Sequence, residues 1–524
     1  MSKKTAIWLF LFIALKSFSQ SATDVIANNI TIGKNNILQN EIIAKEYTFE
    51  KRIHHSYIDS ITGYATLELR KLSKNGKIAG INGLIVLFDL NTKTVKWTKK
   101  VDYSTSSIKQ YNDIIILSKG NKTIRLNIED GSEMWETKND IYYVDASKKI
   151  AIGYKNTGFA SNLHTLEGID LTNGITLWSK ELNREYGWNR IFSLNESELL
   201  IAAGGLHRLN VKDGLGWDYE TVTGKKDYTE TIAKNVGGIA LGLLTGTYIV
   251  STGSNVVTDV VSNTLIDSTH IYMASKEQLA CLKKDNGSII WTYQLPEDST
   301  SKSSLIIQDS SLILINKGYA FWRNRTINFG EPFILKINKE TGKEVYFKSL
   351  NEKENPVYNY KIENDSLLAL FKNQLTNYSL SDGLSGQSNT FNNETYGDFK
   401  FFVGNSLYKK AEDSDSNYVT VNDSINIFVQ TSKGKTIKID KKFNVIEAYD
   451  FDNLYLRHSI YKNFTLLNQK DYIIILDSNN KSIAELNVSF DSLIIGDKLY
   501  DLKNNKLLEV NLAEILNTTS ESSF

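Results

Sequence analysis

The chain has 524 residues, of which 41% are hydrophobic and 23% are charged, so it is long and apolar enough to bury a large core. Its 60 basic and 60 acidic side chains give a formal charge of zero, which argues against a general binder of nucleic acid or of anionic membranes. Cys281 is the single cysteine, so an internal disulfide is excluded, and its place in an apolar repeat strand predicts a buried thiol.

Residues 1–19 have the features of a secretory signal peptide. Lys3 and Lys4 precede an apolar run of ten residues, 6–15, and small residues suited to cleavage follow it. The run is too short to span a membrane. Because no cysteine follows the run, no lipid anchor is expected. The mature chain is therefore expected to be periplasmic or secreted in a bacterium.

A short phrase that ends in an aromatic residue recurs along the chain. Each copy contains an alternating strand, a tight turn that usually holds Asp-Gly or Asn-Gly, and a second strand. The spacings between successive ends are 38, 43, 39, 74 and 55 residues. The copies end at Trp97, Trp135, Trp178, Trp217, Trp291 and Tyr346. A period near 40 predicts β-sheets stacked radially, with each aromatic ring filling the gap to the next sheet.

This phrase resembles the repeat of the PQQ-like β-propeller family, whose pattern runs roughly Ala-x-Asp-x-x-Thr-Gly-x-x-x-Trp. Residues 168–178 and 336–346 match it best, and the resemblance covers about residues 77–390. Residues 438–446 are read as a further copy with neither Gly nor Trp. Residues 502–508 are expected to close the ring with N-terminal strands.

The repeat predicts an all-β fold, an eight-bladed β-propeller over residues 24–515, with seven blades as the alternative. Residues 516–524 are expected to form a disordered tail. Because one propeller scaffold hosts many activities, the repeat indicates the fold and leaves the function open.

Strand parity places three unusual segments, 185–190, 222–263 and 318–329, on one rim of the ring. In a four-stranded antiparallel blade, the loops between the second and third strands and between blades share a rim, opposite the Asp-Gly turns. Residues 222–263 form an apolar, Gly-rich insertion without any charge from 236 to 258. The insertion either packs over its own propeller or forms an exposed hook for a partner protein or a membrane surface. Its glycines and hydroxyl residues disfavour a membrane span.

Two tryptophans fall outside the signal peptide and the repeat positions, and both lie in these rim segments. Trp188 is close to Arg190, and Trp322 is followed by Arg323 and Arg325. Aromatic faces beside arginine suit sugars, quinones, peptides or anionic groups. The alternative is that the two rings plug the central channel or cover the edge of the core.

No catalytic motif is present: HExxH, GxxxxGK[ST], GxSxG and paired CxxC are all missing, and the six histidines lack metal-ligand spacing. No catalytic residue, metal or cofactor is therefore expected. The family resemblance also implies an enzymatic alternative, because some members are PQQ-dependent dehydrogenases with a calcium-bound quinone. The branch that this chain resembles more closely is the non-enzymatic one that contains the outer-membrane assembly propeller lipoprotein.

The sequence thus predicts a non-catalytic binding scaffold in the bacterial cell envelope. The expected partner is an envelope protein, with a glycan or another small ligand as the alternative and nucleic acid excluded. Peripheral contact with a membrane through 222–263 stays open. The predicted contact residues are Trp188, Arg190, Trp322, Arg323, Arg325, Leu241, Leu244 and Tyr248.

Overall fold

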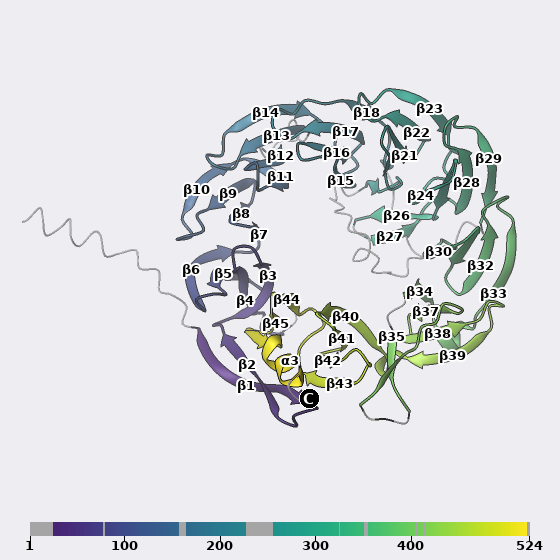
Figure 1. The fold of residues 1–524 in the computed structure, drawn as a ribbon. Coiled ribbons are helices and arrows are strands. Elements are labelled where there is room, and N and C mark those ends of the chain that lie inside the picture. Colours follow the sequence, from purple (N-terminus) through teal and green to yellow (C-terminus); the bar gives the residue numbers. More distant parts are fainter. Residues whose placement is uncertain are drawn as a thin grey trace, which may run out of the picture.

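The computed structural model describes residues 25–76, 79–156, 164–226, 255–323, 325–350, 355–404, 407–412, 414 and 416–520. The predicted signal peptide lies outside these residues. Within them the chain forms antiparallel sheets that follow one another around a ring (Figure 1). The prediction of an all-β propeller fold is confirmed.

Eight separate sheets have four strands each, and in six of these the four strands are consecutive along the chain. They are β3 (Arg52–Asp59), β4 (Tyr64–Leu72), β5 (Ala79–Asp89) and β6 (Thr94–Asp102); β7 (Ser106–Tyr111), β8 (Ile114–Lys119), β9 (Lys122–Leu126) and β10 (Glu133–Thr137); β11 (Asn139–Asp145), β12 (Ile150–Lys155), β13 (Thr165–Asp170) and β14 (Thr176–Glu181); β15 (Arg190–Ser193), β16 (Glu198–Ala202), β17 (Gly205–Asn210) and β18 (Asp218–Glu220); β20 (Leu265–Ile266), β21 (His270–Ala274), β22 (Gln278–Lys283) and β23 (Ile289–Gln294); β24 (Ser303–Gln308), β25 (Ser311–Asn316), β28 (Phe333–Asn338) and β29 (Glu344–Ser349); β30 (Asn359–Glu363), β31 (Ser366–Leu370), β32 (Gln374–Ser379) and β33 (Ser385–Thr390); and β34 (Phe399–Phe402), β37 (Ile427–Thr431), β38 (Lys435–Ile439) and β39 (Val445–Asp450).

An eleven-stranded sheet joins the two ends of the chain. In spatial order its strands are β36 (Tyr418–Thr420), β35 (Leu407–Lys410), β40 (Tyr455–Tyr461), β41 (Phe464–Gln469), β42 (Tyr472–Leu476), β43 (Ser482–Leu486), β1 (Ile26–Asn35), β2 (Glu41–Thr48), β46 (Lys506–Asn511), β45 (Lys498–Lys503) and β44 (Leu493–Ile495). N-terminal β2 pairs with C-terminal β46, with Lys45 opposite Glu509. The predicted closure of the ring by residues 502–508 and N-terminal strands is confirmed.

The number of blades depends on how this large sheet is divided. It contains two further runs of four antiparallel strands, β40 to β43 and β44-β45-β46-β2, which β1 connects. These runs add to the eight separate sheets, so the predicted count of eight blades, or seven, is not confirmed.

Three short helical segments accompany the strands in the described part of the chain: α2 (Asn393–Tyr396), the 3₁₀ helix η3 (Phe451–Asn453) and α3 (Leu512–Ser520). Helix α3 corrects the predicted disordered tail, because residues 516–520 are helical; its N-terminal half packs Leu512, Ile515 and Leu516 into the closing core. Among the described residues, no helix is long and apolar enough to cross a membrane.

Middle strands of the blades are buried on both faces because each sheet lies between two others. Along β25, Leu312 and Leu314 pack toward the preceding sheet, and Ile313 and Ile315 pack toward the following one. This alternation follows from the two-residue period of a strand. Cys281 on β22 is buried as predicted, and its burial raises the pKa of the thiol to about 12.

The repeated aromatic residue locks each blade to the next one. The Trp178 Nε1 donates a hydrogen bond to the Val211 carbonyl at 3.0 Å, and the Tyr346 hydroxyl replaces this bond by donating to Leu380 at 3.1 Å. The same bond recurs from Trp97 to Ile128, Trp135 to Leu171, Trp217 to Lys284 and Trp291 to Lys339.

Turn glycines make room for these rings. Gly214 has φ +72°, and a Cβ added there would lie 2.6 Å from the Trp178 ring. Glycine is therefore required at this position for two reasons: the backbone is left-handed, and the indole approaches too closely for a side chain.

Where the repeat fades, the aromatic ring between two blades comes from the turn of the second blade and not from the strand end of the first. Gln387 lies four residues after the turn glycine Gly383, which is the position of the repeated aromatic residue, but its side chain is exposed and does not pack between the blades. In the next blade the turn residue is Phe443, which has φ +59° and a ring that is buried against Leu368, Phe391 and their neighbours. A side chain from the turn thus replaces the aromatic residue that is missing at Gln387, which explains why the turn within residues 438–446 lacks glycine.

Candidate functional site

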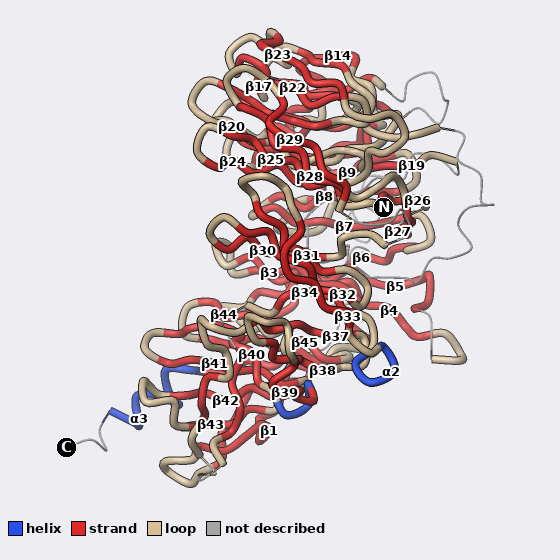
Figure 2. Tube along the Cα trace, turned by 90° about the vertical axis from the view of Figure 1, so that its right-hand side faces the viewer, coloured by secondary structure: helices blue, strands red, loops and turns tan. Residues whose placement is uncertain are grey.

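Two of the three predicted rim segments form one small sheet. Strand β19 (Val257–Thr258), at the end of the insertion, pairs with β26 (Tyr319–Trp322), which continues into β27 (Arg325–Asn328). Val257 lies opposite Trp322 in this pairing. The sheet lies on the same side of the ring as α2 (Figure 2).

The two ends of the insertion are held together in a paired stem. Lys225 and Val257 exchange backbone hydrogen bonds of 2.9 and 2.8 Å, and the Val260 amide donates to the Thr223 carbonyl. The two described ends of the insertion therefore lie side by side. Residues 227–254, including the predicted contact residues Leu241, Leu244 and Tyr248, lie outside the described residues.

The third rim segment contacts this stem. Glu185 forms an ion pair with Lys226, and Tyr186 packs so closely over Gly224 that a Cβ there would lie 2.4 Å from its ring. The described parts of all three segments therefore lie next to one another, as their shared rim predicts.

Trp188 is buried, with 4% of its surface exposed. Its Nε1 donates to the Tyr154 hydroxyl at 2.8 Å, and its ring contacts Tyr142 and Tyr154. Arg184 closes this cluster, with its guanidinium 4.3 Å from the centre of the Tyr154 ring. The ring therefore covers the edge of the core between two blades, which confirms that alternative for Trp188 and corrects its assignment as an exposed contact residue.

Trp322 is buried to the same extent, at 4% exposure. It packs with Val257, Val260 and Ile327 in a cluster between β19, β26 and β27. Arg323 lies over the outer side of the indole, 4.4 Å from its centre, and Arg325 is also exposed. The ring holds the stem of the insertion on the propeller, so the surface available to a partner here consists of the two arginines.

Arg190 faces a pocket that the sequence did not predict, which we call the inner pocket. Its wall comes from β15, β24 and β30, which are first strands of their blades and lie near the centre of the ring (Figure 1), and from the loop 259–264. The cavity has a volume of about 330 Å³. A second cavity of about 830 Å³ shares Asn189 and Arg190 with it and extends along β11 toward Tyr142.

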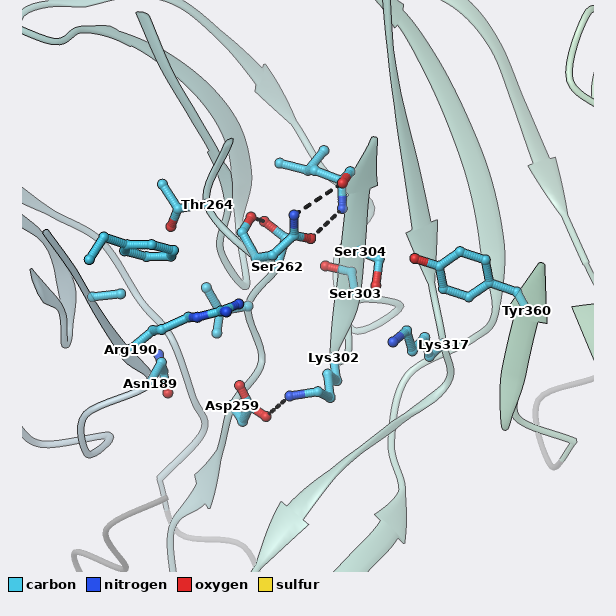
Figure 3. A pocket seen from close by; sticks show the side chains of 15 residues that line it. Asn189, Arg190, Asp259, Ser262, Thr264, Lys302, Ser303, Ser304, Lys317 and Tyr360 are labelled. Carbon is cyan, nitrogen blue, oxygen red and sulfur yellow. Dashed lines mark hydrogen bonds and ion pairs between the residues drawn. The ribbon is translucent and has the colours of Figure 1, made fainter. Parts of the chain in front are cut away.

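A buried ion pair forms the floor of the inner pocket. Asp259 and Lys302 contact each other directly and are 2% and 7% exposed (Figure 3). Lys317 lies nearby, 5.5 Å from the centre of the Tyr360 ring. Burial, together with the positive charge of Lys302, lowers the pKa of Lys317 to about 8.

Sequence reasoning found only Arg190 among the charged residues of this pocket. Asp259, Lys302 and Lys317 lie on separate strands and loops, and no motif connects them. One available signal was Asp259, the first charge after the uncharged stretch 236–258. No group of three or more His, Cys, Asp or Glu side chains able to hold a metal occurs among the described residues.

The chain resembles known proteins in its N-terminal half. Residues 74–293 match the family model described as outer membrane protein assembly factor BamB. The match spans the blades from β5 to β23 and covers less than half of the chain. It agrees with the family resemblance expected from the repeat. No curated protein sequence matches the chain.

Solved structures that resemble the chain have little sequence in common with it. BamB from Moraxella catarrhalis is 12% identical, with a TM-score of 0.31 over 72% of this chain and 96% of that one. Sqt1 from Saccharomyces cerevisiae is 10% identical, with a TM-score of 0.30 over 80% of this chain and 99% of that one. The computationally designed Ika8 protein is 9% identical, with a TM-score of 0.28 over 77% and 97%. At these values the similarities carry no statement about function.

Proposed function

We propose that this protein is a non-catalytic β-propeller scaffold that binds a protein partner in the bacterial cell envelope. The observation that carries the proposal is the match of residues 74–293 to the family of an outer membrane protein assembly factor. The partner would bind the rim formed by the insertion stem, the sheet of β19, β26 and β27, and the loop around residue 185. Removal of residues 1–19 on export would place the mature chain in the periplasm or outside the cell.

Two features suit the rim to binding a protein partner: the hydrogen-bonded stem of the insertion and the composition of the surface around it. The paired stem holds the two ends of the insertion together, and the sheet beside it carries exposed Arg323 and Arg325. The uncharged stretch 236–258 next to exposed arginines matches the composition of protein interfaces, which combine an apolar centre with arginine.

A deletion tests the proposal directly. Because Lys225 and Val257 are hydrogen-bonded partners, residues 227–254 can be replaced by Asn-Gly with the stem retained. Crosslinked cell envelopes from wild type and from this variant would be compared by affinity purification and mass spectrometry. A partner recovered with wild type and lost with the deletion supports the proposal. Equal recovery of every protein from both samples contradicts the assignment of the rim.

Charged substitutions provide a finer test with a matched control. Leu241→Asp combined with Leu244→Asp should weaken partner recovery by about tenfold or more, since two charges in an apolar contact must be desolvated. The control introduces the same change at Leu215 and Leu384, which are 70% and 56% exposed in turns on the opposite rim. Equal recovery of the partner with both double variants would show that the insertion is not part of the interface.

A further inference from the structure

Positive charge exceeds negative charge in the inner pocket. Arg190, Lys302 and Lys317 line it, and Asp259 is its single carboxylate. Asp259 is already paired with Lys302. The Asp259 carboxylate also attracts Lys317, so one negative group serves two ammonium groups, and the guanidinium of Arg190 has no carboxylate partner of its own among the residues that line the pocket (Figure 3).

The same pocket contains hydrogen-bond donors that no described residue satisfies. Asn189 is 5% exposed, and its Nδ2 has no acceptor within the described residues. Arg190 contacts the Phe192 ring but donates no hydrogen bond to a described residue, and the Lys317 ammonium likewise finds no acceptor there. An unpaired buried donor costs about 1–3 kcal/mol, which applies here to the Asn189 amide, whereas Arg190 is exposed and Lys317 is half-buried. The three donors around one cavity indicate a place for an acceptor-rich ligand.

The pocket wall is held in place before any ligand binds. The Asn263 side chain donates to the Leu305 carbonyl at 3.1 Å and accepts from the Leu305 amide at 2.7 Å, which fixes the loop 259–264 to β24. Asp259 has φ +64°, a backbone conformation that aspartate tolerates, and its carboxylate holds the Lys302 side chain. A rigid wall lowers the entropic cost of binding.

We propose that the inner pocket binds a small ligand that carries carboxylate or phosphate oxygens. The planar fork of Arg190 suits two oxygens of such a group, and Lys317 adds a second positive charge on the opposite wall. Hydroxyl groups of Ser303, Ser304 and Thr264 supply neutral donors around them. The volume of about 330 Å³ is at the lower end of the range for small-molecule sites.

Calorimetric titration of the purified protein at low ionic strength tests this proposal, with citrate and inorganic phosphate as probes and glycerol as the neutral control. Binding of citrate, phosphate or both, without binding of glycerol, is expected. Binding of citrate alone assigns the site to carboxylates, and binding of phosphate alone assigns it to phosphates. If neither oxyanion binds, the proposal is wrong.

Substitutions locate the binding. Arg190→Gln and Lys317→Met should each weaken oxyanion binding by about tenfold or more, because each removes a charge-assisted contact. The control is Arg457→Gln, which removes an exposed arginine on β40, away from the pocket. Equal loss of affinity in all three variants would assign the effect to the net charge of the protein and overturn the proposal. The outcome does not depend on whether the rim binds a protein partner, because the two experiments measure different ligands.

Discussion

Replacing the turn glycine Gly342 by alanine should release one blade from the next. Gly342 has φ +68°, and a Cβ there would lie 2.6 Å from Trp291 Cδ2. An ordinary contact begins at 3.4 Å, so the indole would have to move by about 0.8 Å. That movement breaks the 2.9 Å hydrogen bond from Trp291 Nε1 to the Lys339 carbonyl.

The expected cost combines three effects. The left-handed backbone costs alanine about 1–2 kcal/mol, overpacking about 1–3 kcal/mol and the lost hydrogen bond about 1 kcal/mol. A loss of about 3–6 kcal/mol in the free energy of unfolding follows. Urea denaturation followed by circular dichroism at 25 °C measures this loss as a lower midpoint.

Gly434→Ala provides the control for the backbone effect. Gly434 has φ +70°, but a Cβ there would meet nothing within 4 Å, so its substitution should cost only about 1–2 kcal/mol. If Gly342→Ala destabilised the protein no more than Gly434→Ala, the indole would not be confined by the glycine and the proposed lock between blades would be wrong.

Three further predictions concern buried polar groups. Lys317→Met should stabilise the protein by up to about 3 kcal/mol at pH 7, because folding lowers the pKa of Lys317 from 10.5 to about 8. Between these two pH values the unfolded chain binds more protons than the folded one, so the stability of the wild type rises with pH. The difference in urea midpoint between the variant and the wild type should therefore disappear as the pH rises from about 8 to 10.5. Lys302→Met should lower the free energy of unfolding by about 3–5 kcal/mol, because it leaves the Asp259 carboxylate buried without its ion-pair partner. Adding Asp259→Asn should restore most of this free energy in thermal unfolding experiments. No recovery in the double variant would refute the pairing. Trp188→Phe should cost about 1–3 kcal/mol in urea denaturation by leaving the buried Tyr154 hydroxyl without its donor, with oxyanion titrations unchanged.

The repeat could be read from the sequence because its chemistry is local. The aromatic residue at each strand end and the turn glycine of the following blade recur at nearly constant spacing, so Trp178 and Gly214 are recognisable without a structure. Phe443 could not be recognised in this way. It compensates for exposed Gln387 in the preceding blade, and nothing in the sequence connects two residues that appear once.

The candidate site was predicted in outline and missed in detail. Strand parity placed the three rim segments together, because antiparallel connectivity alone decides on which rim a loop lies. Parity cannot tell whether a side chain points out or in, so the sequence left open whether Trp188 and Trp322 bind a ligand or cover the edge of the core, and both are buried. The inner pocket was missed because Asp259 and Lys302 are 43 residues apart and meet only when neighbouring blades pack.

The pairing of β2 with β46 has a consequence for the order of folding. Lys506 and Glu46, which form an ion pair across these strands, are 460 residues apart, so β2 lacks the other three strands of its blade until nearly the whole chain has been synthesised. Bringing ends this distant together costs roughly 5 kcal/mol of chain entropy, which the finished contacts must offset. Until then β2 presents an unpaired strand edge, the kind of surface that aggregates or exchanges between molecules. A nascent chain, or one truncated before residue 506, therefore leaves this edge of β2 open, and pairing with β46 closes it.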